Sequence, residues 1–263
     1  MLRHRLVLAS LVAVAFGTTV AFASTASAAP PASSDQQSTM RFGERKRVGD
    51  GVMCSWVRCD KDGTPLAIGV AFTEGTLSGL PDTLPTTEYA LSLPPEAAAT
   101  AFTHFAANWN PKGHIPEGVY DMPHFDFHFY IISPAVRAQI TATGDDLARV
   151  LKTPPTGCLP DGYITAPGAS EPHMGNHWID AASPELHGKR FTTTLVYGSY
   201  DGKLAFVEPM MTKAFLEAKP SFISPIKLPA KYLTRAYYPT RYSVSYGGAR
   251  RRYTVALEGL TLR

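Results

Sequence analysis

Residues 123–130 alternate strictly between polar and apolar side chains, and this is the clearest structural signal in the chain. Their sequence, PHFDFHFY, places His124, Asp126 and His128 at every second position, with phenylalanines between them. A period of two predicts a β-strand with its polar side chains on one face and its phenylalanines on the other. We therefore expect a strand whose Phe face is buried in the core.

Similar patterns elsewhere predict a mainly β protein. Further strands are expected at residues 52–57, 66–72, 89–93, 191–197 and 204–207, and a hairpin at residues 241–262. Signals for helix starts predict short helices at residues 94–106, 135–140, 145–151 and 212–219. The expected fold class is mainly β with a few short helices (α+β), an antiparallel β-sandwich or barrel-like single domain.

The first 28 residues have the pattern of a secretory signal peptide. A basic start precedes an apolar core over residues 6–16, and a run of small residues ends in Ala26-Ser27-Ala28. The apolar core is shorter than the ~20 residues that a membrane-spanning helix needs. We expect a secreted, extracytoplasmic protein with no transmembrane anchor after cleavage. A flexible segment is expected over residues 29–48 and a single β-rich domain over residues 49–263.

Charge and cysteine content narrow the class of protein further. The formal net charge is +3, and removing the two arginines of the signal peptide leaves +1. A nearly neutral chain has no field that attracts nucleic acid, so we expect no nucleic-acid partner. Export makes a disulfide plausible among Cys54, Cys59 and Cys158, with one thiol left over. The sequence leaves their pairing open.

Histidine placement indicates where the chemistry lies. Seven of the eight histidines fall between His104 and His187, and imidazole is the commonest metal ligand in proteins. On an extended strand, residues two apart are separated by roughly 6.6 Å and residues four apart by roughly 13 Å. Metal–nitrogen bonds are only about 2.0–2.1 Å long. All three polar residues of the strand predicted at residues 123–130 can therefore bind one ion only if the strand bends.

Other segments must complete such a site. His177 lies between Gly175 and Trp178, and Glu208 is expected at the end of a strand. The predicted metal ligands are His124, Asp126, His128, His177 and Glu208, where Asp126 either ligates or orients an imidazole. This set suits zinc, iron or manganese. His114 and His173 are reserve ligands, whereas His104, expected on a helix, and His187 are expected at the surface.

Several motifs together resemble a family of secreted bacterial proteins classified as a domain of unknown function. These motifs are PHFDFHFY, MGxHW at residues 174–178, and YGxYDG followed by FxEPM between residues 197 and 210. The resemblance spans roughly residues 52–228. It implies a coherent exported domain and brings no established activity.

Two functions from different classes fit these observations. The first is an exported metal-binding protein, an enzyme with a cupin-like set of ligands that acts on a small molecule. The second is a non-catalytic secreted envelope or stress protein whose His-Asp-His cluster is structural. The chain has no G-x-S-x-G elbow, P-loop, H-E-x-x-H motif or dinucleotide fingerprint. The reaction, the catalytic residues, the substrate and a homo-oligomeric state stay open.

Overall fold

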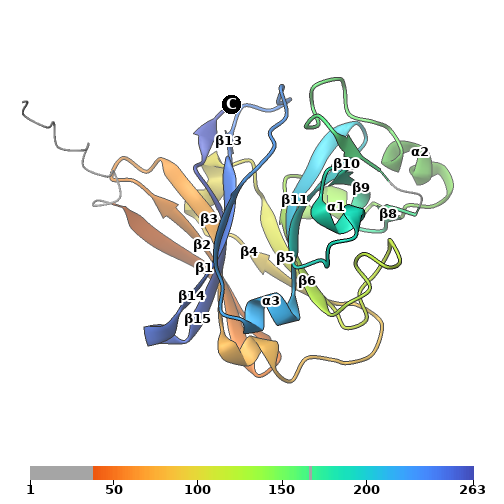
Figure 1. The fold of residues 1–263 in the computed structure, drawn as a ribbon. Helices are drawn as coiled ribbons and strands as arrows, with labels where there is room; N and C mark the ends of the chain where they lie inside the picture. Colours follow the sequence, from red (N-terminus) through yellow and green to blue (C-terminus); the bar gives the residue numbers. More distant parts are fainter. Residues whose placement is uncertain (1–37, 166–167) are drawn as a thin grey trace, which may run out of the picture. The chain divides into compact units, whose positions relative to one another are not determined.

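Antiparallel strands are the dominant regular structure in the part of the chain that the computed structural model describes, residues 38–165 and 168–263 (Figure 1). The predicted signal peptide lies outside these residues. The described residues belong to one compact unit. The expectation of a mainly β single domain with a few short helices is confirmed.

The first sheet has six strands in the order β1-β2-β3-β15-β14-β12. Their bounds are β1 Thr39–Val48, β2 Gly51–Cys59, β3 Pro65–Thr73, β15 Arg252–Glu258, β14 Arg241–Gly247 and β12 Ser221–Pro225. The prediction of a flexible segment over residues 29–48 was wrong for residues 39–48, because these residues form β1. This strand pairs with β2 at the edge of the sheet, and most of its side chains are exposed. Its polar sequence suits that position.

The second sheet has eight strands, in the order β4-β5-β6-β11-β10-β9-β7 with β8 also paired to β9. Their bounds are β4 Thr87–Ser92, β5 His104–Asn110, β6 His124–Tyr130, β11 Lys203–Thr212, β10 Thr193–Tyr200, β9 Gly175–Asp180, β7 Tyr163–Ile164 and β8 Ser170–Glu171. A separate small pair consists of β13 Tyr237–Tyr238 and β16 Thr261–Leu262. Neighbouring strands within the sheets are antiparallel.

Helical segments are short. The α-helices are α1 Pro134–Arg137, α2 Leu147–Val150 and α3 Lys213–Glu217, and the 3₁₀ turns are η2 Glu74–Leu77, η3 Pro95–Ala99, η4 Gly144–Asp146, η5 Pro184–His187 and η6 Gly248–Arg250. Ser133 caps α1 and Thr212 caps α3 through their side-chain oxygens. No helix among the described residues is long and apolar enough to cross a membrane.

The Phe face of β6 fills the space between the two sheets, as its alternation predicts. Phe125, Phe127 and Phe129 are at most 1 % exposed, and the Phe127 ring packs on Phe72 of β3 with ring centroids 6.0 Å apart. Burial of each ring contributes about 1.5–3 kcal/mol relative to exposure. The opposite face of β6 is buried as well. Tyr120, from the segment between β5 and β6, belongs to an apolar cluster that covers this side of the sheet.

Two predictions about local structure were wrong. The helix expected at residues 94–106 stops at η3, and His104 begins β5, where it is buried and stacks on Tyr130 with ring centroids 4.6 Å apart. β5 lies between β4 and β6. Both of its faces are buried, so alanines and aromatic residues lie on it beside buried polar residues, and its first half shows no strict alternation.

The predicted disulfide is also absent from the described residues, where all three cysteines are buried free thiols. Cys54 and Cys59 both lie on β2, five residues apart along the chain. An extended strand separates such residues by roughly 16 Å. A disulfide requires Cα atoms within about 7 Å of one another.

Candidate metal centre

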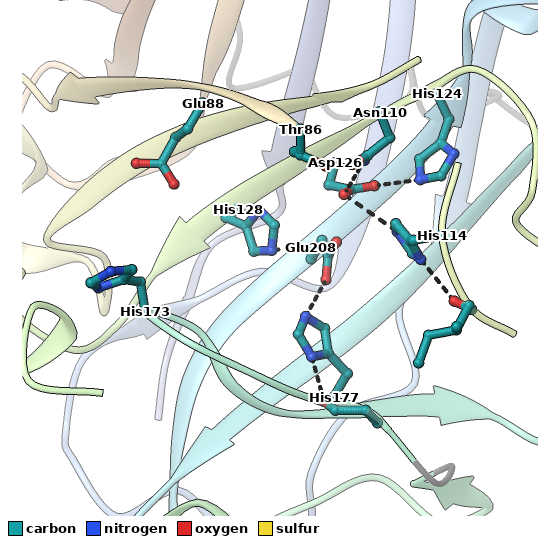
Figure 2. A network of polar contacts seen from close by, with 12 residues as sticks. Thr86, Glu88, Asn110, His114, His124, Asp126, His128, His173, His177 and Glu208 are labelled. Atoms are coloured by element: carbon teal, nitrogen blue, oxygen red, sulfur yellow. Dashed lines mark hydrogen bonds and ion pairs between the residues drawn. The ribbon is translucent and has the colours of Figure 1, made fainter. Parts of the chain in front are cut away.

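β6 presents its three polar side chains on one buried face of the eight-stranded sheet. His124 and His128 are fully buried and Asp126 is 4 % exposed. The strand is not bent enough to bring all three to one point. Instead they divide between two groups of potential ligands, each of which is completed by residues from other segments (Figure 2).

The first group, which we call the His128 cluster, consists of His128, His177 and Glu208. One ligand atom from each residue lies within 4.8 Å of the other two. His128 Nε2 lies 3.4 Å from Glu208 Oε1, and His177 Nε2 lies 3.9 Å from Glu208 Oε2. The cluster brings together residues from three strands that are far apart in the sequence, β6, β9 and β11.

Strand register explains this convergence. β11 pairs with β6 through Val207↔Phe129 and Met210↔Asp126, which places Glu208 opposite His128. Directly opposed side chains on neighbouring strands are about 4.5–5.5 Å apart at Cβ. Glu208 was expected at the end of a strand, but β11 continues to Thr212 and holds the carboxyl group within the sheet.

A glycine lets the two imidazoles approach the carboxyl group. Gly198 of β10 pairs with Phe206 on one side and with His177 on the other. A Cβ atom at Gly198 would lie 2.0 Å from the Phe206 ring, so the ring occupies the space that the missing side chain leaves. The same ring lies 4.8 Å from the His128 ring and 5.1 Å from the His177 ring, centroid to centroid. Phe206 thus supports both imidazoles.

Burial disfavours charge on every member of the His128 cluster. Loss of water around the rings lowers the pKa of His128 to about 3 and that of His177 to about 4. Burial, and next the charge of Asp126, raise the pKa of Glu208 well above its usual value. The two histidines are therefore free bases, and the carboxyl group retains its proton more strongly than an exposed glutamate does.

The cluster is also poor in hydrogen bonds. Three of its buried atoms make no hydrogen bond among the described residues: Nδ1 and Nε2 of His128 and Oε2 of Glu208. His177 Nδ1 lies 2.8 Å from the carbonyl oxygen of Ala169, which fixes the proton on Nδ1 and leaves the Nε2 lone pair facing Glu208. Each unsatisfied buried polar group costs about 1–3 kcal/mol. A cation between the three residues would bind His128 Nε2 and a Glu208 oxygen, whereas His128 Nδ1 would stay without a partner among the described residues.

The second group, which we call the His114 cluster, consists of His114, His124 and Asp126. His124 Nε2 lies 3.0 Å from Asp126 Oδ1, and His114 Nε2 lies 3.5 Å from Asp126 Oδ2. Burial alone would lower the pKa of His114, but the Asp126 carboxylate outweighs burial and raises it to about 9. Burial is likewise outweighed at Asp126, where first His124 and then His114 hold the pKa well below its usual value.

Both clusters border one cavity of about 350 Å³. His114 and Asp126 line it from the second group, and His177 and Glu208 from the first. Apolar side chains form much of the remaining wall, from Ile115, Pro116, Met174, Ile179, Val196 and Met210. A small molecule in the cavity would therefore contact both groups.

All five predicted ligands lie on this face of the sheet, but they do not form one site. His177 and Glu208 join His128, whereas His124 and Asp126 pair with His114, which the sequence suggested only as a reserve. The other reserve, His173, is exposed and belongs to neither group. His187 is exposed, as expected.

Asn110, Thr86 and Gly198 were not anticipated as site residues. Asn110 and Thr86 support the His114 cluster by hydrogen bonds. Asn108 and Asn110 do alternate along β5, and this signal could have indicated that Asn110 lies on the polar face.

Comparison with known proteins gives a partial match. Residues 60–109 are similar to a family described as TTHB210-like, hypothetical protein TTHB210. This agrees with the expectation of an uncharacterised family, and the matched residues run from the turn after β2 into β5. The residues of the two clusters lie outside the match. No curated protein and no solved structure matches the chain.

Proposed function

We propose that this protein is an exported divalent-metal protein whose ion is held by His128, His177 and Glu208. We further propose that it is an enzyme acting on a small molecule bound in the adjoining cavity. The observation that carries the proposal is the set of buried ligand atoms in the His128 cluster. They converge within 4.8 Å of one another, and three atoms, Nδ1 and Nε2 of His128 and Oε2 of Glu208, have no hydrogen-bond partner among the described residues.

A purely structural polar network fits these atoms less well. Such a network stabilises a fold when its donors and acceptors are satisfied, and it is costly when they are not. Here two neutral imidazoles and one carboxyl group face one another with poor hydrogen-bond geometry. Imidazole nitrogens and a carboxylate oxygen are the donor set of many zinc, iron and manganese sites.

The surroundings favour an ion that remains accessible. His177 and Glu208 line the cavity, whereas His128 lies behind them against Phe206. Three protein ligands leave coordination positions open to a substrate or water, and an ion so placed supplies a Lewis acid for polarising a bound oxygen. The protein contributes an apolar wall, and the cavity volume lies at the small end of the range for small-molecule sites.

Elemental analysis of untagged protein tests the proposal. We expect bound zinc, iron or manganese in the wild type and the loss of one equivalent in His128→Ala. His187→Ala removes an exposed histidine outside both clusters and is the matched control, which should keep its full metal content. A wild type without stoichiometric metal, and a His128→Ala variant that is merely less stable, would contradict the proposal.

A further inference from the structure

We propose that the His114 cluster is a second site for a divalent transition metal such as zinc, next to the His128 cluster and bordering the same cavity. His114, His124 and Asp126 each offer one ligand atom, and these atoms lie within 4.8 Å of one another. The inference goes beyond the site of the proposed function, because the two groups share no residue and each can bind an ion or fail to bind one separately.

Among the described residues, two buried atoms of this cluster have only each other as close polar partners. His124 is fully buried and Asp126 is 4 % exposed. His124 Nε2 and Asp126 Oδ1 lie 3.0 Å apart, yet neither atom makes a hydrogen bond within the described residues. Two polar atoms that face each other without a hydrogen bond are those that a shared cation would satisfy.

The imidazoles are held with their Nε2 atoms directed at Asp126. His114 Nδ1 lies 2.7 Å from the carbonyl oxygen of Ile115, and His124 Nδ1 lies 2.7 Å from that of Met122. A hydrogen bond to a carbonyl oxygen requires the proton on Nδ1, so each ring turns its Nε2 atom, the one that would bind an ion, toward the Asp126 carboxylate. Metal-ligating histidines are oriented in this way, with the second ring nitrogen donating to a backbone carbonyl or a carboxylate.

The carboxylate is also held in place by other residues. Asn110 Nδ2 donates to Asp126 Oδ2 at 2.6 Å, and Thr86 Oγ1 donates to Asn110 Oδ1 at 2.7 Å. Asn110 is the cross-strand partner of His124, so β5 brings the amide to the cluster. Hydrogen bonds that orient a ligating carboxylate are a regular feature of metal sites. Figure 2 shows this arrangement around Asp126.

His114 comes from the segment that covers the sheet. The backbone N–H of His114 donates to the carbonyl oxygen of Tyr120, and Gly113 has a φ of +70° where an added Cβ would lie 2.0 Å from that same oxygen. This turn brings the ring back over β6. An ion at the cluster would link the segment over residues 111–123 to the strand, so the amides of this segment should exchange more slowly when the ion is bound.

Zinc titration of untagged, chelator-stripped protein tests the proposal, with the bound ion counted by equilibrium dialysis and native mass spectrometry. We expect two equivalents in the wild type, one in His114→Ala, one in His177→Ala and two in the control His187→Ala. The His114 side chain is 37 % exposed, so its removal should leave the fold intact, which circular dichroism checks. In His177→Ala, the remaining ion should slow amide exchange over residues 111–123.

The outcomes separate this inference from the proposed function. A single equivalent in the wild type that His177→Ala abolishes would overturn the second site and leave the first. Wild-type stoichiometry in His114→Ala would also overturn it. If His177→Ala has the wild-type stoichiometry while His114→Ala loses one ion, the second site stands and the proposed function fails.

Discussion

Replacing Glu208 with glutamine separates metal binding from folding at the His128 cluster. Glu208 is 1 % exposed, and burial raises its pKa well above the usual value, so the metal-free fold disfavours a charge on this carboxyl group. Glutamine is neutral and of nearly the same size. The variant should therefore lose an anionic ligand while leaving the stability of the metal-free fold within about 1 kcal/mol of the wild type.

The magnitude follows from binding linkage. An ion present at 100 times its dissociation constant stabilises the folded state by about 2.7 kcal/mol. For a domain of this size, 1 kcal/mol shifts the melting temperature by about 2–4 °C. Zinc binding at one site should thus raise the melting temperature by roughly 5–11 °C, and Glu208→Gln should abolish most of that rise at the same zinc concentration.

The assay is thermal unfolding followed by circular dichroism, with and without zinc. Because the His114 cluster would contribute its own ion, the comparison is made in a His114→Ala background, which isolates the first site. Glu117→Gln changes an exposed glutamate in the same chemical way and should keep the full zinc-dependent rise. An equal rise in Glu208→Gln would refute the assignment of Glu208 as a ligand.

Two further predictions concern the same cluster. The folded-state pKa values of His128 and His177, about 3 and about 4, lie below the value of about 6.5 for an unfolded chain, so their stabilising contribution is present above pH 6.5 and is lost as the pH falls toward 4. In urea unfolding of the metal-free protein, the free energy of unfolding should fall by up to about 1.4 kcal/mol per pH unit for each histidine. His177→Gln should remove the contribution of one histidine. Parallel curves of unfolding free energy against pH for the two proteins would contradict this. Gly198→Ala places a Cβ against the Phe206 ring that supports both imidazoles, so it should cost about 1–3 kcal/mol in chemical denaturation and weaken zinc affinity in dialysis at least about tenfold. Unchanged zinc affinity in that variant would show that Phe206 does not position the ligands.

The period-two pattern of polar and apolar residues predicted individual strands and their buried faces. The alternation in β6 correctly indicated a strand with a buried Phe face, because side chains on a strand point to opposite faces whatever the partner strands are. The same reasoning failed for β5. Its alanines favour a helix, but pairing with β4 and β6 and burial on both faces outweigh that preference.

The grouping of the ligands could not be read from the sequence. Strand spacing predicted that His124 and His128 would not share one ion without a bend, and in the structure they fall into two different groups of potential ligands. That either group binds an ion stays a prediction. Which residue joins which histidine depends on the register between β6 and β11 and on the turn that carries His114. Neither is encoded in the pattern of a single strand, since strand order and register are set by the packing of the whole sheet.

Anomalous scattering from a crystal grown with zinc tests the central claim most directly. The account predicts an anomalous peak in the His128 cluster, at about 2.0–2.2 Å from His128 Nε2, His177 Nε2 and an oxygen of Glu208. Absence of a peak there, with His128 and Glu208 joined by an ordinary hydrogen bond, would contradict the account and assign the cluster a structural role.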